Sequence, residues 1–252
     1  NNINFHFLSP QQIKDLEPNL KKSFYKGILF EESKFTVNPL KFIQKIFNEY
    51  QAMKGVFTNK NIIKIENEDN LILLKDDHKK FHKFNKIVIC AGSFSNNISN
   101  LVGENFPIVS ERGYHLMYKN HKNLISRPIS IVSHGSYYTP MEDGLRAAGT
   151  VEIGVNDKLI NKKRTNWMHQ NTINNFNIQE NPDKIWLGYR PTLPDSLPII
   201  GKSKVNPNII YNFGHQHLGL TLGAFSAELV LKIISNVEIH SILKNLNPNR
   251  FN

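Results

Sequence analysis

The residues with the clearest capacity for chemistry lie in the segment 186–201, which reads WLGYRPTLPDSLPIIG. Arg190 is its central cation. A guanidinium can bind a carboxylate through two parallel hydrogen bonds, and Pro191 restricts the backbone directly after it. We therefore expect Arg190 to bind the carboxylate of a small substrate. The alternative is an arginine that forms a salt bridge at the surface.

A second segment, GHQHLGLTLG at 214–223, follows a predicted buried strand at 208–213 and leads into a predicted helix at 218–234. Its glycines leave the backbone uncovered at the strand-to-helix turn. The free N–H groups at the start of a helix favour negative charge. The segment therefore predicts a binding site for a planar anionic group, although close packing of the helix on the strand would also explain the glycines.

Three earlier segments complete a pattern that resembles a known family. They are IVICAGSFS at 87–95, ERGYH at 111–115 and PMEDGLRAAGTVE at 140–152. The five segments occur in the order seen in FAD-dependent D-amino-acid dehydrogenases, within a wider group that includes glycine, sarcosine and D-amino-acid oxidases. The resemblance covers nearly the whole chain.

The resemblance implies an FAD-dependent oxidoreductase that converts a D-amino acid or a cyclic imino acid to the imino or keto acid, with hydride transfer to flavin N5. One alternative is a glycine- or sarcosine-type amine oxidase that uses oxygen. Another is a non-catalytic FAD-binding subunit or fragment. The expected partners are the amino-acid substrate and a quinone or other electron-transfer acceptor.

The expected catalytic residues are Arg190 and Tyr137. Tyr137 and Tyr138 could each place a hydroxyl above the flavin, but neighbours in a strand point to opposite faces, so we favour Tyr137. An aromatic core role is the alternative for it. Arg112 and Gly113 resemble a family turn that passes close to the flavin, although Arg112 could equally pair with a carboxylate.

The helix start near 217–221 is expected to stabilise the negative charge of reduced flavin, mostly through backbone N–H groups. We expect Gly219 to lie at the pyrimidine edge of the flavin and to disfavour a branched side chain there. The full set of predicted FAD-binding residues is Ala91, Gly92, Arg112, Gly113, Gly214, His215, His217, Leu218, Gly219, Leu220 and Thr221.

Other chemistries fit less well. His215 and His217 stand two residues apart, but no third ligand follows at suitable spacing, so no metal site is predicted. The single cysteine, Cys90, excludes an internal disulfide and suits a reducing compartment. Because Cys90 ends an apolar strand, we expect a buried and inert thiol. The sequence contains neither a serine-hydrolase elbow nor a phosphate-binding loop of the GxxxxGK[ST] type.

The sequence departs from the family in one respect. Family members begin with a strand, a GxGxxG turn and a helix that hold the ADP pyrophosphate, and this fingerprint occurs nowhere in the chain. The chain also begins at Asn1 rather than Met. We expect it to be the C-terminal part of a longer protein, with supply of the fingerprint by a separate polypeptide as the alternative. In either case the chain alone should hold FAD poorly.

Composition limits the partners. The formal net charge is +10 over 252 residues, but the lysines are scattered without interleaved aromatic residues, so nucleic-acid binding is not expected. A basic face that meets anionic lipid would suit a dehydrogenase that passes electrons to a membrane quinone, and a solvated lysine-rich surface is the alternative. The sequence has no apolar run of membrane-spanning length and no signal peptide, and we expect a cytoplasmic protein, with peripheral contact on the inner face of the cytoplasmic membrane as a variant.

The predicted fold is a mixed α/β (α+β) arrangement. An incomplete Rossmann-like FAD-binding domain, formed by 36–100 and 195–252, is interleaved with an antiparallel-sheet substrate domain, formed by 1–35 and 101–194. Helices are expected at 10–16, 38–54, 94–101, 158–176 and 218–234. Strands are expected at 27–31, 62–66, 71–75, 86–90 and 208–213, with further strands across 107–155.

Overall fold

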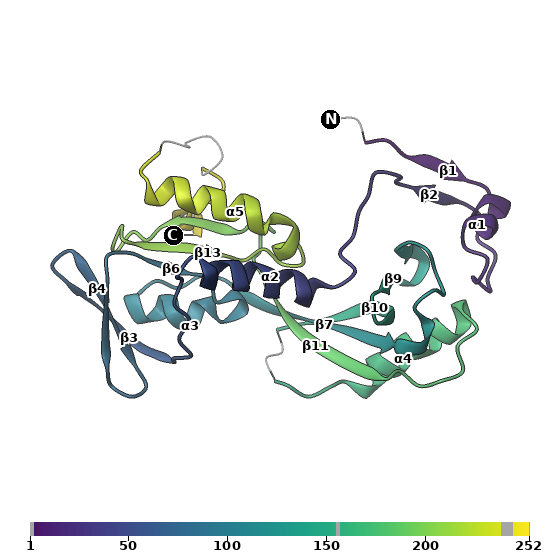
Figure 1. Cartoon of the computed structure of the whole chain (residues 1–252), viewed down its shortest axis with the longest axis horizontal. Coiled ribbons are helices and arrows are strands. Elements are labelled where there is room, and N and C mark those ends of the chain that lie inside the picture. Colours follow the sequence, from purple (N-terminus) through teal and green to yellow (C-terminus); the bar gives the residue numbers. More distant parts are fainter. Residues whose placement is uncertain (1–2, 155–156, 238–243, 252) are drawn as a thin grey trace. The chain divides into compact units, whose positions relative to one another are not determined.

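The computed structural model describes residues 3–154, 157–237 and 244–251 (Figure 1). The chain divides into two compact units. Unit 1 comprises Asn1–Phe57, Gly113–Val151 and Asp157–Gly188, and unit 2 comprises Thr58–Arg112, Glu152–Asn156 and Tyr189–Asn252. Both units are discontinuous in sequence. The segments 36–57, 101–112, 152–154 and 189–194 group differently from the expected domains. The functional assignment of those domains stays a prediction.

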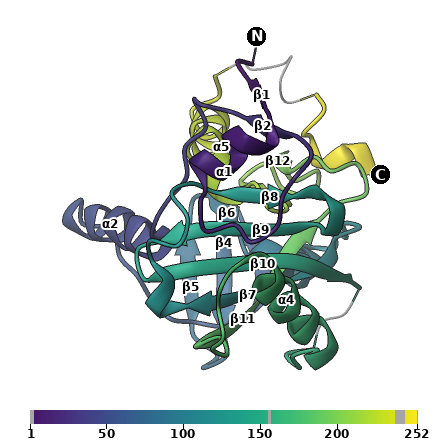
Figure 2. The same cartoon turned by 90° about the vertical axis from the view of Figure 1, so that its right-hand side faces the viewer.

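A five-stranded sheet, in the order β11-β7-β10-β9-β8, forms the framework of unit 1 (Figure 2). Its neighbours β8, β9 and β10 pair antiparallel, which agrees with the sheet expected across 107–155, of which residue 155 lies outside the described part of the chain. The strands are β7 (Val109–Tyr118), β8 (Ile129–Ile131), β9 (Ser136–Met141), β10 (Gly144–Ile153) and β11 (Lys184–Thr192). Strands β7, β10 and β11 each continue into residues of unit 2.

One face of this sheet carries the core of unit 1. Helix α4 (Lys162–Asn175) begins after its N-cap Asn161 and contributes Met168 to that core. Tyr138 of β9 and Ala147 of β10 pair directly across the hairpin, and both are buried in the same cluster. Because strand residues alternate between faces, their neighbours in sequence point to the opposite face of the sheet.

The N-terminal part of unit 1 consists of β1 (His6–Leu8), α1 (Pro10–Leu16), β2 (Gly27–Leu29) and α2 (Pro39–Ala52). Ser9 forms a capping box with Gln12 at the start of α1, and Asn38 caps α2 ahead of a proline at the first helical position. The predicted starts of both helices are therefore confirmed. No residue of α2 is buried, and Leu40 and Ile43 of its apolar stripe are 68% and 50% exposed.

Unit 2 contains two three-stranded sheets, ordered β3-β4-β5 and β12-β13-β6. In the second sheet β6 lies parallel to β13, and α5 packs through Leu229, Val230 and Ile233 against Ile200 and Ile210 of β12 and β13. The elements are β3 (Ile62–Glu68), β4 (Leu71–Asp76), β5 (Phe81–Phe84), β6 (Ile87–Ile89), α3 (Ser95–Ser99), β12 (Ile199–Lys202), β13 (Ile209–Phe213) and α5 (Gly219–Ile234). This is the mixed α/β architecture that the sequence predicts.

The expected burial of Cys90 is wrong. Cys90 is exposed directly after β6, which forms an outer strand of its sheet, and Val88 within β6 is 38% exposed. The apolar run 87–90 indicates a strand correctly, but an outer strand is not covered on every side. The sequence alone does not distinguish an outer strand from a central one.

Candidate functional site

The start of helix α5 has the features of an anion-binding site. Leu218 occupies the N-cap position without a side-chain hydrogen bond to the helix. Within the described residues, the backbone N–H groups of Gly219, Leu220 and Thr221 have no hydrogen-bond acceptor. A Cβ atom added at Gly219 would meet only the Cβ of His215, at 3.7 Å. The donors are therefore free and uncovered, as binding of a negatively charged group requires.

The strained positions of this turn lie before Gly219. Gly214 has a φ of +88° and Gln216 a φ of +51°, whereas Gly219 has no positive φ. A side chain at Gly214 would also collide with Leu193. Gly219 therefore has no backbone strain that would require a glycine. Gly214 is the position in this turn that requires a glycine, because its φ is positive and a side chain would collide with Leu193.

The two histidines of the turn have different surroundings. The ring of His215 lies 2.7 Å from the Ser226 hydroxyl of α5, and burial lowers the pKa of His215. His217 is exposed. In the part of the chain that the structure describes, no three histidine, cysteine or acidic side chains gather as a metal site would require.

The turn before α5 is tied to the segment that carries Arg190. The backbone N–H of Gln216 donates to the carbonyl oxygen of Pro191 at 3.2 Å. The side-chain Nε2 of Gln216 is buried and has no hydrogen-bond partner among the described residues. The structure therefore brings together two motifs that lie more than twenty residues apart in the sequence.

The guanidinium of Arg190 pairs with a carboxylate of the protein itself. Its Nη1 lies 2.7 Å from Oε1 of Glu111, and the hydroxyl of Thr192 donates to Oε2 of Glu111 at 3.2 Å. The side chain of Arg190 is 32% exposed. The sequence gives no sign that Glu111 is the partner, because the two residues belong to different strands, β7 and β11.

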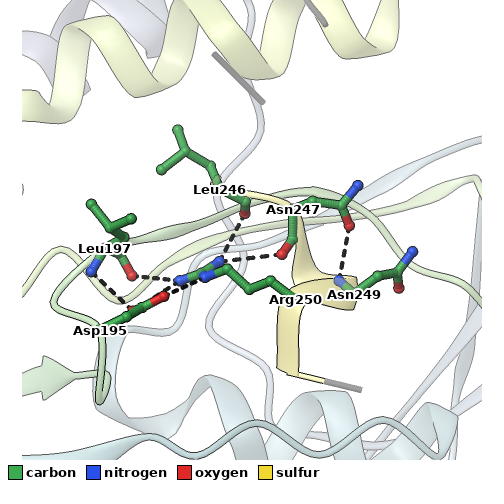
Figure 3. A network of polar contacts seen from close by, with 6 residues as sticks. All are labelled: Asp195, Leu197, Leu246, Asn247, Asn249 and Arg250. Atoms are coloured by element: carbon green, nitrogen blue, oxygen red, sulfur yellow. Dashed lines mark hydrogen bonds and ion pairs between the residues drawn. The ribbon is translucent and has the colours of Figure 1, made fainter. Parts of the chain in front are cut away.

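The turn that follows Arg190 is held by the C-terminal segment (Figure 3). Arg250 donates from Nε to Asp195 Oδ2 at 2.6 Å and from Nη2 to the carbonyl oxygen of Leu197 at 2.7 Å. The hydrogen bond from Arg250 is the largest cause that lowers the pKa of Asp195. A Cβ atom at Gly201 would lie 2.6 Å from Cδ of Pro248. Asp195 and Gly201 therefore have structural roles in this segment: Asp195 binds Arg250, and Gly201 leaves room for Pro248.

Arg112 and Gly113 do not form a turn. Both lie inside β7, and Arg112 is only 3% exposed. The Arg112 guanidinium pairs with Glu152 of β10 at 2.5 Å, which is the carboxylate pairing left open by the sequence. Because β7 continues to residue 118, Gly113 lies within a strand and not at a reversal of the chain.

Ala91 and Gly92 follow β6 and begin a short 3-10 helix at 92–94. Gly92 has a φ of +57°, and no atom lies within 4 Å of a Cβ built on it. The conformation favours glycine, and the space beside it is open.

The face of the unit 1 sheet opposite its core carries polar groups. Tyr137 pairs with Ala148, and Thr139 pairs with Arg146, so these four residues share one face. Tyr137 is 54% exposed, whereas Tyr138 is 1% exposed and accepts a hydrogen bond from Asn175 in the core. The alternation expected for the two tyrosines is confirmed, with Tyr137 on the open face.

Comparison with known proteins places this geometry in a family. A family model described as FAD dependent oxidoreductase matches residues 1–233. The chain belongs to the FAD-dependent oxidoreductase family. It is 27% identical over 249 residues to a D-amino-acid oxidase of Bradyrhizobium diazoefficiens, a match that covers 97% of this chain and 59% of the relative.

Further relatives agree with the family assignment. The chain is 26% identical over 237 residues to a D-amino acid dehydrogenase of Helicobacter pylori, with 92% of this chain and 56% of the relative covered. The fold is that of glycine oxidase from Geobacillus kaustophilus, with a TM-score of 0.85, 16% identity, and coverage of 99% of this chain and 68% of that one. The chain thus spans somewhat over half the length of these curated relatives.

The described residues fit the cofactor of this FAD-dependent family. The unpaired N–H groups at the start of α5 and the buried, unsatisfied Nε2 of Gln216 suit a negatively charged, hydrogen-bonding edge. The open space at Gly219 allows a flat group to approach the backbone. These are the residues of this chain that would hold the flavin.

Proposed function

We propose that this chain is part of an enzyme that oxidises a D-amino acid, or a related cyclic imino acid, to the imino or keto acid. The substrate class follows the names of the curated relatives, which are D-amino-acid oxidases and dehydrogenases. FAD, when bound, supplies the acceptor for the hydride that leaves the substrate Cα.

The observation that carries this proposal is the hydrogen bond from Gln216 to Pro191. It joins the uncapped start of α5, which suits an anionic cofactor edge, to the residue next to Arg190, which suits a substrate carboxylate. An enzyme that oxidises the carbon beside a carboxylate needs these two functions next to each other.

The residues of the chain would divide the work as follows. Arg190 binds and orients the substrate carboxylate, and Glu111 sets the position of its guanidinium. The N–H groups of Gly219, Leu220 and Thr221 stabilise negative charge at the start of α5. Tyr137, on the open face of unit 1, stays the second predicted catalytic residue, with its hydroxyl as the reactive group.

The experiment uses the full-length protein with FAD under anaerobic conditions. D-Amino acids should bleach the flavin absorbance, whereas L-amino acids should not. Bleaching by glycine or sarcosine instead, with fast reoxidation by oxygen, would favour the amine-oxidase alternative. If no amino acid bleaches the flavin, the non-catalytic alternative replaces the proposal.

We further propose that a quinone reoxidises the enzyme and that the cytoplasmic protein meets the inner membrane surface through the ribbon of β1 and β2. Among the described residues, no helix is long and apolar enough to cross a membrane. Phe7 and Ile28 pair across this ribbon and are 56% and 54% exposed. The ammonium of Lys26 lies 4.2 Å from the ring centre of Phe7. Exposed apolar side chains beside a lysine suit anionic lipid.

Vesicle sedimentation tests this contact. Full-length protein should bind phosphatidylglycerol vesicles at low salt, and the double variant Phe7→Ser and Ile28→Ser should bind them much more weakly. Equal binding of the wild type and this variant would exclude the ribbon as the contact.

A further segment that carries the GxGxxG fingerprint is also proposed, on the same chain or on a partner chain. The exposed apolar stripe of α2 supports it, because such a stripe is normally covered in a soluble protein. The sequence of the complete gene tests this proposal directly.

A further inference from the structure

Arg146 differs from the other arginines of the chain. The sequence contains six arginines, and five of them form hydrogen bonds or ion pairs with other residues. Within the described ranges, Arg146 forms none, and its Nε is buried without an acceptor. A partly buried guanidinium normally has an acceptor, because burial removes the water that would otherwise solvate it.

The position of Arg146 in the sheet determines the face to which its guanidinium points. Its neighbours Leu145 and Ala147 are buried in the core of unit 1, so Arg146 points to the opposite face. Thr139 lies directly across the β9–β10 pair on that face, and Tyr137 is the next residue along β9 with the same orientation. A guanidinium and two hydroxyl groups therefore share one exposed surface of the hairpin.

Two further residues of unit 1 belong to this face. His115 of β7 stacks on Trp186 of β11, with ring centres 4.9 Å apart. Burial, followed by the positive charges of Arg146 and Lys184, lowers the pKa of His115 to about 4. His115 is therefore neutral at pH 7. Since no acidic side chain of the described residues pairs with Arg146, no ion pair neutralises its positive charge.

We infer that Arg146 binds a carboxylate group on the open face of unit 1. A carboxylate matches the planar fork of the guanidinium and can accept a further hydrogen bond from the Thr139 hydroxyl opposite. The inference rests on the proposed function in assigning this carboxylate to the substrate. Two substrate groups have the same chemistry. One is a second acidic group on the side chain, and the other is the α-carboxylate, whose binding would transfer to Arg146 the role proposed for Arg190.

Binding of two non-reactive probes tests the inference in full-length, FAD-loaded protein. Propionate has one carboxylate and glutarate has two, and neither has an amine that could be oxidised. Isothermal titration calorimetry gives the Kd. The part of the protein fluorescence that is lost in Trp186→Phe provides a second signal, because Trp186 lies on this face.

Arg146→Met should weaken binding of at least one probe by about thirtyfold or more, which corresponds to roughly 2 kcal/mol. If Arg146 binds the α-carboxylate, both probes should weaken alike. If it binds a second acidic group, only glutarate should weaken. Arg146→Lys keeps the charge but loses the fork, so it should also weaken binding, and it serves if the methionine variant does not fold.

Lys184→Met is the matched control, since Lys184 is an exposed cation whose charge also acts on His115. It should change either Kd by less than about threefold, because an exposed charge acts on the ligand only through a screened field. If Lys184→Met weakened binding as much as Arg146→Met, the effect would come from the overall positive potential, and a direct contact between Arg146 and the carboxylate would be excluded. Unchanged binding in a folded Arg146 variant would also overturn it. If the wild type oxidises no amino acid yet binds a probe through Arg146, the proposed function fails and this inference stands.

Discussion

Arg190 and Glu111 form an ion pair in which Nη1 lies 2.7 Å from Oε1, while Thr192 holds the other oxygen of the same carboxylate. One edge of the guanidinium is thus engaged before any ligand binds. If Arg190 has its proposed role, a substrate carboxylate must either share the guanidinium with Glu111 or displace Glu111 from it. Loss of the Arg190 guanidinium should therefore lower the affinity for substrate, whereas loss of the Glu111 charge should raise it.

Arg190→Ala should lower kcat/KM of the complete enzyme by an amount equivalent to roughly 2–5 kcal/mol, because a charge-assisted hydrogen-bonded contact is lost. Arg190→Lys should also lower kcat/KM, since an ammonium cannot form the two parallel hydrogen bonds that a guanidinium forms with a carboxylate. Steady-state kinetics measures both. A change of less than about threefold in either variant would remove Arg190 from the site.

Glu111→Gln should have the opposite effect on binding. It removes the internal negative charge that competes for Arg190, so the KM for an amino acid and the Kd for propionate should fall. If the pair is only structural, this variant should instead lower Tm and leave both constants unchanged. Calorimetry and kinetics on one preparation separate these outcomes.

Gly219→Val should fold but purify with little flavin, because the branched side chain fills the space beside the free N–H groups of α5. Ala224→Val is the control, an exposed position farther along the same helix, and it should keep its flavin. His217→Ala should also keep the flavin, since the backbone donors survive, and should alter mainly its redox behaviour. Flavin absorbance per protein, with circular dichroism, decides the matter: full flavin content in a folded Gly219→Val protein would place the cofactor elsewhere.

His115 should titrate near pH 4 in the folded protein, and Arg146→Met should raise its pKa while burial still keeps it below the ordinary value. Lys184 contributes in the same direction as Arg146, and Trp186 covers the ring. Because the unfolded state takes up the proton first, His115 should reduce stability as pH falls from about 6.5 towards 4. An NMR titration that shows no rise in the pKa of His115 in Arg146→Met would contradict the proximity of the two groups.

Asp76→Asn should destabilise unit 2 at neutral pH. Asp76 is buried at the end of β4 and accepts hydrogen bonds from His82 at 3.0 Å and from the backbone of Lys80 at 2.9 Å. These bonds, with Lys60, hold the pKa of Asp76 well below its usual range. The contribution is fully present above the unfolded pKa of about 3.9. It declines below that value and is lost as pH falls through the lower folded pKa, so the Tm gap between wild type and variant should narrow in acid.

Local signals made several elements predictable. Asn38 and Pro39 mark the start of α2 because an Asx cap and a proline at the first position are properties of the nearest residues. In contrast, β1 and β5 span only three and four residues, too few for alternation to show. Strand β11 contains Gly188 and Pro191, which in sequence favour a loop.

For the candidate site, too, local sequence identified the residues, whereas their partners depend on the fold. The residue types identified Arg190 and the start of α5, but long-range pairing determined what each one contacts. Glu111 beside Arg190 and Glu152 beside Arg112 depend on how β7, β10 and β11 are placed in one sheet. Among the residues that the structure describes, Arg146 has no side-chain partner, which is likewise a property of the folded sheet that no local pattern could indicate.

Strand β6 has one more consequence, which concerns the folding of the protein. In the described part of the chain it pairs with β13 alone, so its other edge presents free backbone groups beside the exposed Val88. A free edge can recruit a strand from another molecule. A chain in which this edge stays unpaired is therefore at risk of aggregation, and the yield of native protein in a cell should depend on whether another strand pairs with β6.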